Sequence, residues 1–260
     1  MTETTSKPLV GKVALVTGGT SGIGKVTMEA LCENGASVAF TGRRKQLGEE
    51  IEESLQDQGY KVIYLQSDLR EISEVDQLIQ DTVATLGSLD VAFNNAGVFD
   101  SDALFHEYDD SSWNDLIAAN LSSVFYCMRA EIAYMLGNDG GVIVNNASIV
   151  GHRGSRRATP GYVASKHGVI GLTRQAALQY ANAGIQVNSV SPGPTLTETQ
   201  QPLFEQGPEA VANHLSSLNP QAAFVTPEEI ANVVLYLASG APDMLTGQDI
   251  AIDGGQLFKL

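Results

Sequence analysis

The sequence predicts an α/β fold in which helices cover both faces of a doubly wound parallel sheet of about seven strands. Short β-branched runs alternate with longer helical patterns from near the start of the chain to near its end. Alternation of this kind is typical of βαβ units. The 260 residues suit one domain, 1–260, and 43% hydrophobic against 17% charged residues allows a sizeable buried core.

Seven runs predict the strands of this sheet. They are nearly continuous in apolar residues, as expected for strands that are buried on both faces. The runs are 12–17, 36–41, 61–66, 89–94, 141–147, 185–190 and 248–252. The helical patterns between them are at about 22–34, 44–58, 71–86, 112–136, 161–182 and 227–239.

Three helix starts carry capping signals. Ser112, with Asp115 three residues later, has the form of a capping box. Residues 226–229, Thr-Pro-Glu-Glu, combine an N-cap, a first-turn proline and an acid at the third position. Thr159-Pro160 predicts a helix that begins near residue 161.

The segment 194–226 has no strand signal and is rich in Gln, Pro and Ala. A segment of this length in a compact domain is usually functional. We interpret it as a helical lid or substrate loop. The alternative is a surface excursion without a role.

The charge balance argues against two classes of partner. Thirty acidic residues against 15 basic ones give a net charge of −15, which repels phosphate backbones and anionic membranes. We therefore expect neither nucleic acid nor membrane as a partner. The start of the chain has no apolar signal core, and a cytoplasmic location is expected.

Cysteine and histidine lack metal-ligand spacing. Cys32 and Cys127 lie in helix-like apolar patterns and are expected to be buried free thiols. The histidines are scattered, without HExxH or paired spacing, so no metal site is predicted. They are His106, His152, His167 and His214.

A glycine-rich turn follows the first predicted strand and opens the first helix. Gly18, Gly22 and Gly24 allow a sharp turn and a close backbone approach to a pyrophosphate. The first N–H groups of the helix and its dipole favour negative charge there. The turn residues expected to bind a dinucleotide are Gly18, Thr20, Ser21, Gly22, Ile23 and Gly24.

The spacing G-x-x-x-G-x-G resembles the cofactor turn of the short-chain dehydrogenase/reductase family, and the resemblance continues from about residue 9 to 256. Asn94-Asn95-Ala96-Gly97 matches the family's NNAG motif, and residues 253–255 match its C-terminal DGG. The resemblance implies a single-domain Rossmann fold and a nicotinamide cofactor. It also implies cofactor contacts from Asp68, Leu69, Asn95, Ala96 and Gly97.

The end of the second strand bears on the choice of cofactor. NAD-specific enzymes place an acid about 20 residues after the glycine turn. Here Gly42 takes that place and Arg43 follows, and an arginine can pair with a 2′-phosphate. We therefore favour NADP(H), with Arg43 as a ligand. The alternative is NAD(H), with solvated Arg43 and Arg44; Ser21, where many NADP-dependent members carry a basic residue, supports it.

Tyr162 and Lys166 are four residues apart on a predicted helix, so both side chains share one face. Carbonyl reduction needs a proton donor beside the substrate oxygen. A neighbouring ammonium is expected to lower the pKa of the phenol from about 10. Ser148, at the end of the fifth strand, can hydrogen-bond the substrate oxygen.

The family resemblance assigns roles to these residues. It implies that Ser148 stabilises the substrate, that Tyr162 is the acid/base and also contacts the cofactor, and that Lys166 modulates Tyr162 and binds the nicotinamide ribose. Asn120 matches the family's fourth member, which supports a water relay to the lysine. Residues 191–197 resemble the PGxxxT segment, which implies nicotinamide contacts from Pro192, Gly193, Thr195 (through its backbone) and Thr197.

Three arginines lie between Ser148 and Tyr162 in an otherwise acidic chain. Arg153, Arg156 or Arg157 could meet an anionic group of the substrate. We favour the alternative, in which they pair with acids of a neighbouring subunit or face solvent.

The predicted function is hydride transfer between a nicotinamide and a small alcohol/ketone pair. Two alternatives stay open: an NAD-linked alcohol or sugar dehydrogenase, and a dinucleotide-binding regulator without catalysis. The intact catalytic set argues against the regulator. The resemblance also implies a homodimer or homotetramer, assembled through helices 112–136 and 161–182 and the C-terminal strand; the apolar ending 256–260 suits such an interface.

Overall fold

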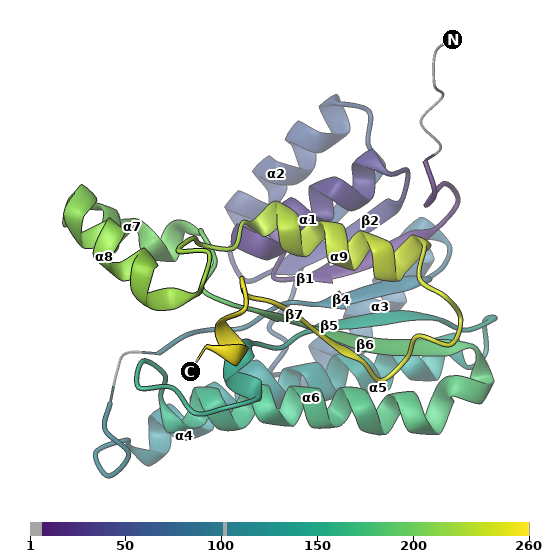
Figure 1. The fold of residues 1–260 in the computed structure, drawn as a ribbon. Coiled ribbons are helices and arrows are strands. Elements are labelled where there is room, and N and C mark those ends of the chain that lie inside the picture. Colours follow the sequence, from purple (N-terminus) through teal and green to yellow (C-terminus); the bar gives the residue numbers. More distant parts are fainter. Residues whose placement is uncertain (1–6, 101–102, 260) are drawn as a thin grey trace.

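The computed structural model describes residues 7–100 and 103–259. Its seven strands form one parallel sheet in the order β3-β2-β1-β4-β5-β6-β7 (Figure 1). All seven predicted strands are confirmed, each within two residues of its expected bounds. They are β1 Val13–Thr17, β2 Ser37–Gly42, β3 Val62–Gln66, β4 Val91–Asn94, β5 Gly141–Asn146, β6 Ile185–Pro192 and β7 Asp249–Ile252.

Helices cover the two faces of this sheet (Figure 1). On one face lie α1 Gly22–Glu33, α2 Lys45–Asp57 and α9 Pro227–Ser239. On the other lie α3 Ile72–Leu86, α5 Ser123–Met135 and α6 Pro160–Tyr180, with α4 Asp110–Ile117 against α6. Strand β1 divides its residues between the two cores: Leu15 packs with the second set of helices, Ala14 and Val16 with the first. The doubly wound fold is therefore confirmed.

The predicted helix 112–136 is interrupted. It consists of α4, a π-helical turn at Ala118–Ser122 and α5. The capping box expected from Ser112 and Asp115 is wrong, because the helix begins earlier. Asp109 is the N-cap and its carboxylate accepts a hydrogen bond from the Ser112 backbone N–H at 2.9 Å. An acid at the N-cap satisfies the first-turn donors that Ser112 would otherwise have to cap.

The other two capping signals are confirmed. Thr226 and Glu229 form a capping box at the start of α9. Thr159 caps α6, which begins at Pro160. Cys32 and Cys127 are buried and free, as predicted.

The segment 194–226 contains helices, as the lid interpretation requires. A 3-10 turn at Glu198–Gln200 leads into α7 Gln201–Phe204, and α8 Pro208–Leu218 follows. Figure 1 shows α7 and α8 projecting beyond the carboxyl ends of the strands. Within residues 7–100 and 103–259, no helix combines the length and apolarity needed to cross a membrane.

Candidate active site

A cavity of about 650 Å³ lies at the carboxyl ends of the strands. It is centred where the strand order reverses between β1 and β4, which is where open α/β sheets bind their ligands. Its walls come from the loops after β1 to β4, from the π-helical turn and the start of α5, from the end of β5, from α6 and from the segment after β6. They are formed by residues 18, 20–23, 41–44, 67–70, 95–99, 119, 123, 146, 162, 166, 197 and 198.

The glycine turn has the shape that a dinucleotide requires. Gly18 has φ +67°, a conformation that side chains disfavour. A Cβ on Gly24 would lie 2.3 Å from the carbonyl oxygen of Gly18, so only glycine lets α1 pack this closely. Ser21 precedes α1 and lines the cavity together with Gly22. The residues present therefore fit a pyrophosphate held at the start of α1.

The NNAG motif holds neighbouring strand ends together. The Thr17 hydroxyl accepts hydrogen bonds from the backbone N–H groups of Asn95 and Ala96, at 2.9 and 3.0 Å. The Asn95 amide donates to the Thr17 carbonyl at 3.0 Å and accepts from Asn146 Nδ2 at 2.9 Å. Asn95 therefore joins β1 to β5, while Ala96 and Gly97 line the cavity.

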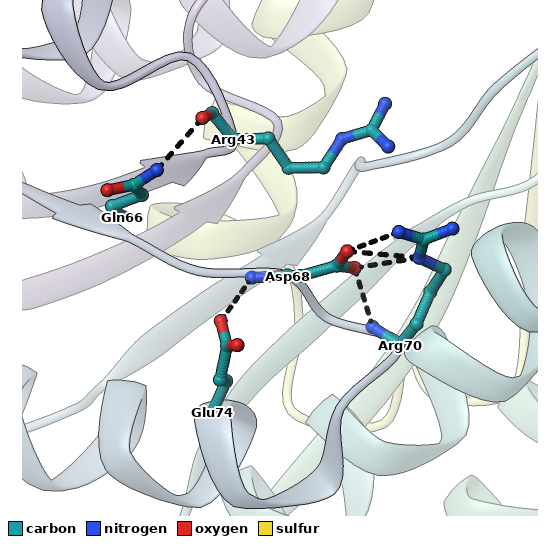
Figure 2. Close-up of polar contacts among 5 residues, drawn as sticks. All are labelled: Arg43, Gln66, Asp68, Arg70 and Glu74. Atoms are coloured by element: carbon teal, nitrogen blue, oxygen red, sulfur yellow. Dashed lines mark hydrogen bonds and ion pairs between the residues drawn. The ribbon is translucent and has the colours of Figure 1, made fainter.

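Asp68 and Leu69 line the cavity, and their contact with the adenine stays a prediction. The Asp68 carboxylate accepts hydrogen bonds from Arg70 Nε at 2.9 and 3.1 Å (Figure 2), and these lower the pKa of Asp68. Figure 2 also shows Arg43 extending from the end of β2, where its carbonyl accepts from Gln66. Any adenine contact by Asp68 would share its carboxylate with Arg70.

Sequence reasoning missed the part played by Arg44. Its guanidinium donates to Thr20 Oγ1 at 3.0 Å and to Ser21 Oγ at 2.9 Å, so it supports the glycine turn from the neighbouring strand. The parallel pairing of Thr17 with Thr41 brings these two strand ends together. A basic residue just after the second strand was the only signal of this contact.

Tyr162 and Lys166 both reach the cavity from α6. Lys166 Nζ lies 5.7 Å from the centre of the Tyr162 ring and donates to the Asn146 carbonyl at 2.8 Å. Burial lowers the pKa of Lys166 to about 8, because it disfavours the charged form.

The expected lowering of the Tyr162 pKa by Lys166 is not met. Burial of the phenol is the largest effect and raises its pKa; the Asp100 charge raises it further. A hydrogen bond with Ser148 lowers it, but by less. Ser148 therefore contacts the phenol, although the net pKa shift is upward, and its contact with a substrate stays a prediction.

Asn120 lies in the π-helical turn and is fully buried. Its side chain accepts from the Val98 N–H at 2.7 Å and donates to the Val98 carbonyl at 2.8 Å. A π-helical turn is frequent at functional sites. Asn120 therefore holds the loop after β4, and the water relay stays a prediction.

The segment after β6 contributes Thr197 and Glu198 to the cavity wall. The Gly193 N–H donates to the Ile252 carbonyl at 2.8 Å, and Thr195 Oγ1 donates to the Gly193 carbonyl at 2.9 Å. Pro192 is the last residue of β6. These contacts order the segment, whose nicotinamide contacts stay a prediction.

Phe99 is a second residue that sequence reasoning missed. Its ring packs edge-on against Tyr162, with centres 4.8 Å apart at 66°, and it is 58% exposed. An apolar surface thus borders the phenol. Arg153, Arg156 and Arg157 are not among the described walls of the cavity, and Arg157 contacts His214 at 3.2 Å.

Comparison with known proteins decides the family. The family model described as enoyl-(acyl carrier protein) reductase matches residues 18–256. Cyclohexanol dehydrogenase of Acinetobacter sp. (strain SE19) is 37% identical over 259 residues, covering 100% of both chains. The chain belongs to the short-chain dehydrogenase/reductase family.

Other members span several activities. The 3-oxoacyl-[acyl-carrier-protein] reductase of Staphylococcus aureus (strain Mu50 / ATCC 700699) is 37% identical over 248 residues, covering 94% of this chain and 97% of its own. The crystal structure of levodione reductase superimposes with a TM-score of 0.90 at 28% identity, covering 97% of this chain and 100% of its own. This short-chain dehydrogenase/reductase is accordingly an NAD(P)-dependent oxidoreductase that acts on CH–OH and C=O groups.

Proposed function

We propose that Tyr162 is the acid/base of this oxidoreductase, with Ser148 and Lys166 as its partners and Asn120 as the support of the loop beside it. The observation that carries the proposal is the position of the Tyr162 phenol. It lines the cavity, hydrogen-bonds with Ser148 and has the Lys166 ammonium over its ring. A bound nicotinamide dinucleotide supplies or accepts the hydride.

The three side chains divide the remaining chemistry. In reduction, Ser148 donates a hydrogen bond to the substrate oxygen as that oxygen gains negative charge, and Tyr162 gives it a proton. Lys166, with a pKa of about 8, is mainly charged at neutral pH and stabilises the phenolate that remains. Because its pKa is raised, Tyr162 stays protonated at neutral pH, which suits reduction; oxidation, which needs the phenolate, should speed up as the pH rises.

NADP(H) is the cofactor that we propose, with NAD(H) as the alternative. Three arginines, Arg43, Arg44 and Arg70, line the cavity, and its described walls carry two carboxylates, those of Asp68 and Glu198. Arg70 already neutralises the carboxylate of Asp68. The balance of charge there favours a ligand with an additional phosphate.

The substrate class that we propose is a secondary alcohol on an apolar ring, or the matching ketone. Phe99 offers an exposed aromatic face next to the Tyr162 phenol. The similar protein from Acinetobacter is named for cyclohexanol. We assign segment 194–226 as the lid over this site, because its residues Thr197 and Glu198 already form part of the wall.

The test is turnover by the purified chain. Oxidation of NADPH and of NADH would be followed with cyclohexanone, a 3-oxosteroid, a linear 3-oxoacyl thioester and a sugar ketone. We expect NADPH to be oxidised fastest with a cyclic ketone. Turnover of the linear thioester alone would overturn the substrate class, and no turnover with any ketone would overturn the enzymatic proposal.

We also propose a homodimer or homotetramer. Phe125 on α5, Leu178 on α6 and Phe258 after β7 are 46%, 81% and 86% exposed, in the parts of the chain that the family resemblance implies for the interface. Burial of such side chains stabilises assembly. A native mass of one chain in sedimentation would contradict this proposal.

A further inference from the structure

Asp100 has no part in the proposed chemistry, yet its carboxylate connects two walls of the site. Oδ1 accepts a hydrogen bond from Thr159 Oγ1 at 2.6 Å, and Oδ2 accepts one from the Tyr108 hydroxyl at 2.5 Å. Thr159 is fully buried and caps α6, where its Oγ1 accepts from the Tyr162 N–H at 3.3 Å. Asp100 is therefore hydrogen-bonded to the residue that caps the first turn of α6, and this turn contains Tyr162.

Packing holds the same two walls together. A Cβ on Gly161 would lie 2.6 Å from the Tyr108 hydroxyl oxygen, so Tyr108 sits directly against the α6 backbone next to Tyr162. Tyr108 follows Asp100 in the chain. Phe99, which directly precedes Asp100, packs edge-on against the Tyr162 ring. The loop after β4 is thus in contact with the first turn of α6 on both sides of Asp100.

We propose that Asp100 is a positioning residue for Tyr162: it ties the loop after β4 to the first turn of α6 and places a negative charge beside the phenol. This inference rests on the proposed role of Tyr162. The hydrogen bonds fix where the phenol stands, and the charge sets how easily the phenol loses its proton. Asp100 itself is not among the described residues that line the cavity, so it acts through Tyr162.

The groups that face the Tyr162 phenol come from three elements. Lys166 is on α6 itself, the Ser148 hydroxyl follows β5, and Asp100, with Tyr108 bonded to it, belongs to the loop after β4. Burial raises the pKa of Tyr162 most, and the Asp100 charge adds to this rise. The same charge raises the pKa of Tyr108, after burial and their hydrogen bond.

Asp100→Asn removes the charge and keeps the shape of the side chain. The amide oxygen still accepts from Thr159, and the amide nitrogen can donate to the Tyr108 oxygen, which reverses the direction of that bond. The pH dependence of kcat would be measured for alcohol oxidation, with the substrate found by the turnover panel. Without the charge the Tyr162 phenolate forms more easily. The part of the kcat profile that rises with pH (its rising limb) should therefore move to lower pH by about 0.5–1 unit. For ketone reduction, which needs the protonated phenol, kcat falls as the pH rises, and this falling limb should also move to lower pH.

Two further variants complete the experiment. Tyr108→Phe removes one hydrogen bond and keeps the Asp100 charge, so kcat should fall while the limb does not move to lower pH. Glu107→Gln makes the same change of charge at an exposed position of the same loop, and its profile should match that of the wild-type chain. Circular dichroism checks that each variant is folded.

An Asp100→Asn limb that coincides with the limbs of wild type and Glu107→Gln would overturn the inference. Equal shifts in Asp100→Asn and Glu107→Gln would do the same, since they would indicate a general charge effect. Tyr162→Phe separates this failure from that of the proposed function. If Tyr162→Phe turns over normally, the role of Tyr162 is wrong; if it is inactive while the Asp100→Asn limb stays in place, only the role of Asp100 is wrong.

Discussion

Burial shifts both members of the Tyr162–Lys166 pair toward their uncharged forms. The pKa of the phenol is raised and that of the ammonium is lowered to about 8. Lys166 Nζ lies 5.7 Å from the centre of the Tyr162 ring and donates a hydrogen bond to the Asn146 carbonyl. Lys166 and Tyr162 therefore do not form a direct ion pair. The spacing of Tyr162 and Lys166 predicts that they meet, but it contains no information on how deeply each is buried.

Arg43 provides the residue-scale test of cofactor choice. A charge-assisted hydrogen bond to a 2′-phosphate is worth about 1.5–3 kcal/mol. Arg43→Ala should therefore raise the Kd for NADPH about 10- to 150-fold and leave the Kd for NADH nearly unchanged. Fluorescence titration of both reduced dinucleotides measures the two constants.

The matched control is Lys45→Ala, which removes a positive charge at an exposed, adjacent helix start outside the described cavity walls. It should change neither constant appreciably. Equal weakening of NADPH and NADH by Arg43→Ala would show that Arg43 does not recognise a 2′-phosphate, and NAD(H) would become the better proposal.

At the scale of elements, a buried polar network joins the sheet to the helices behind the cavity. Asn94 Nδ2, at the end of β4, donates to Glu131 on α5 and to Asn145 Oδ1 on β5, both at 3.0 Å. Asn145 in turn donates to Thr173 on α6 at 2.9 Å. Glu131 is fully buried, and its Oε1 finds no hydrogen-bond partner among the described residues. A charge there is costly.

This burial raises the pKa of Glu131 from 4.5 to about 7. A raised pKa means that the folded chain holds this proton more tightly than the unfolded chain. Its stabilising contribution is therefore complete below about pH 4.5 and is lost as the pH rises through 7. The shift corresponds to about 3 kcal/mol.

Glu131→Gln should remove this loss, because the amide keeps an acceptor for Asn94 and carries no charge. The quantity to compare is the free energy of unfolding of the variant minus that of wild type. We expect this difference to be about 3 kcal/mol larger at pH 8 than at pH 4.5. Urea unfolding at both pH values measures it, with the exposed Glu53→Gln as the control. A difference from wild type that is the same at both pH values would contradict this account.

The helix predicted over 112–136 illustrates what patterning can and cannot reveal. Its apolar period is continuous, so the sequence predicts one helix. The structure instead inserts a π-helical turn that brings Asn120 onto the backbone of Val98. This turn depends on a contact with a distant loop, which no local pattern contains. The Asp109 cap is different, because it is a local contact with Ser112: both residues are of types that cap helices, and the pattern alone does not decide between them.

At the scale of the whole molecule, the alternation of strands and helices was sufficient to predict the parallel sheet. The sequence motifs follow the carboxyl ends of the strands, and a parallel sheet brings those ends to one edge. Gly18, Asn95 and Tyr162 could therefore be placed in one site from the sequence. Arg44, Phe99 and Asp100 could not, since their roles arise from contacts between loops. Loop geometry, unlike strand order, is not encoded in periodicity.

The central claim is that the phenol of Tyr162 carries the proton in a site that binds the dinucleotide mainly through other residues. Tyr162→Phe tests it most directly when turnover and NADPH binding are measured on the same preparation. We predict that turnover falls at least about 100-fold, the usual contribution of an acid/base, while the Kd for NADPH stays within a few-fold of wild type. Turnover that survives the loss of this hydroxyl would contradict the account.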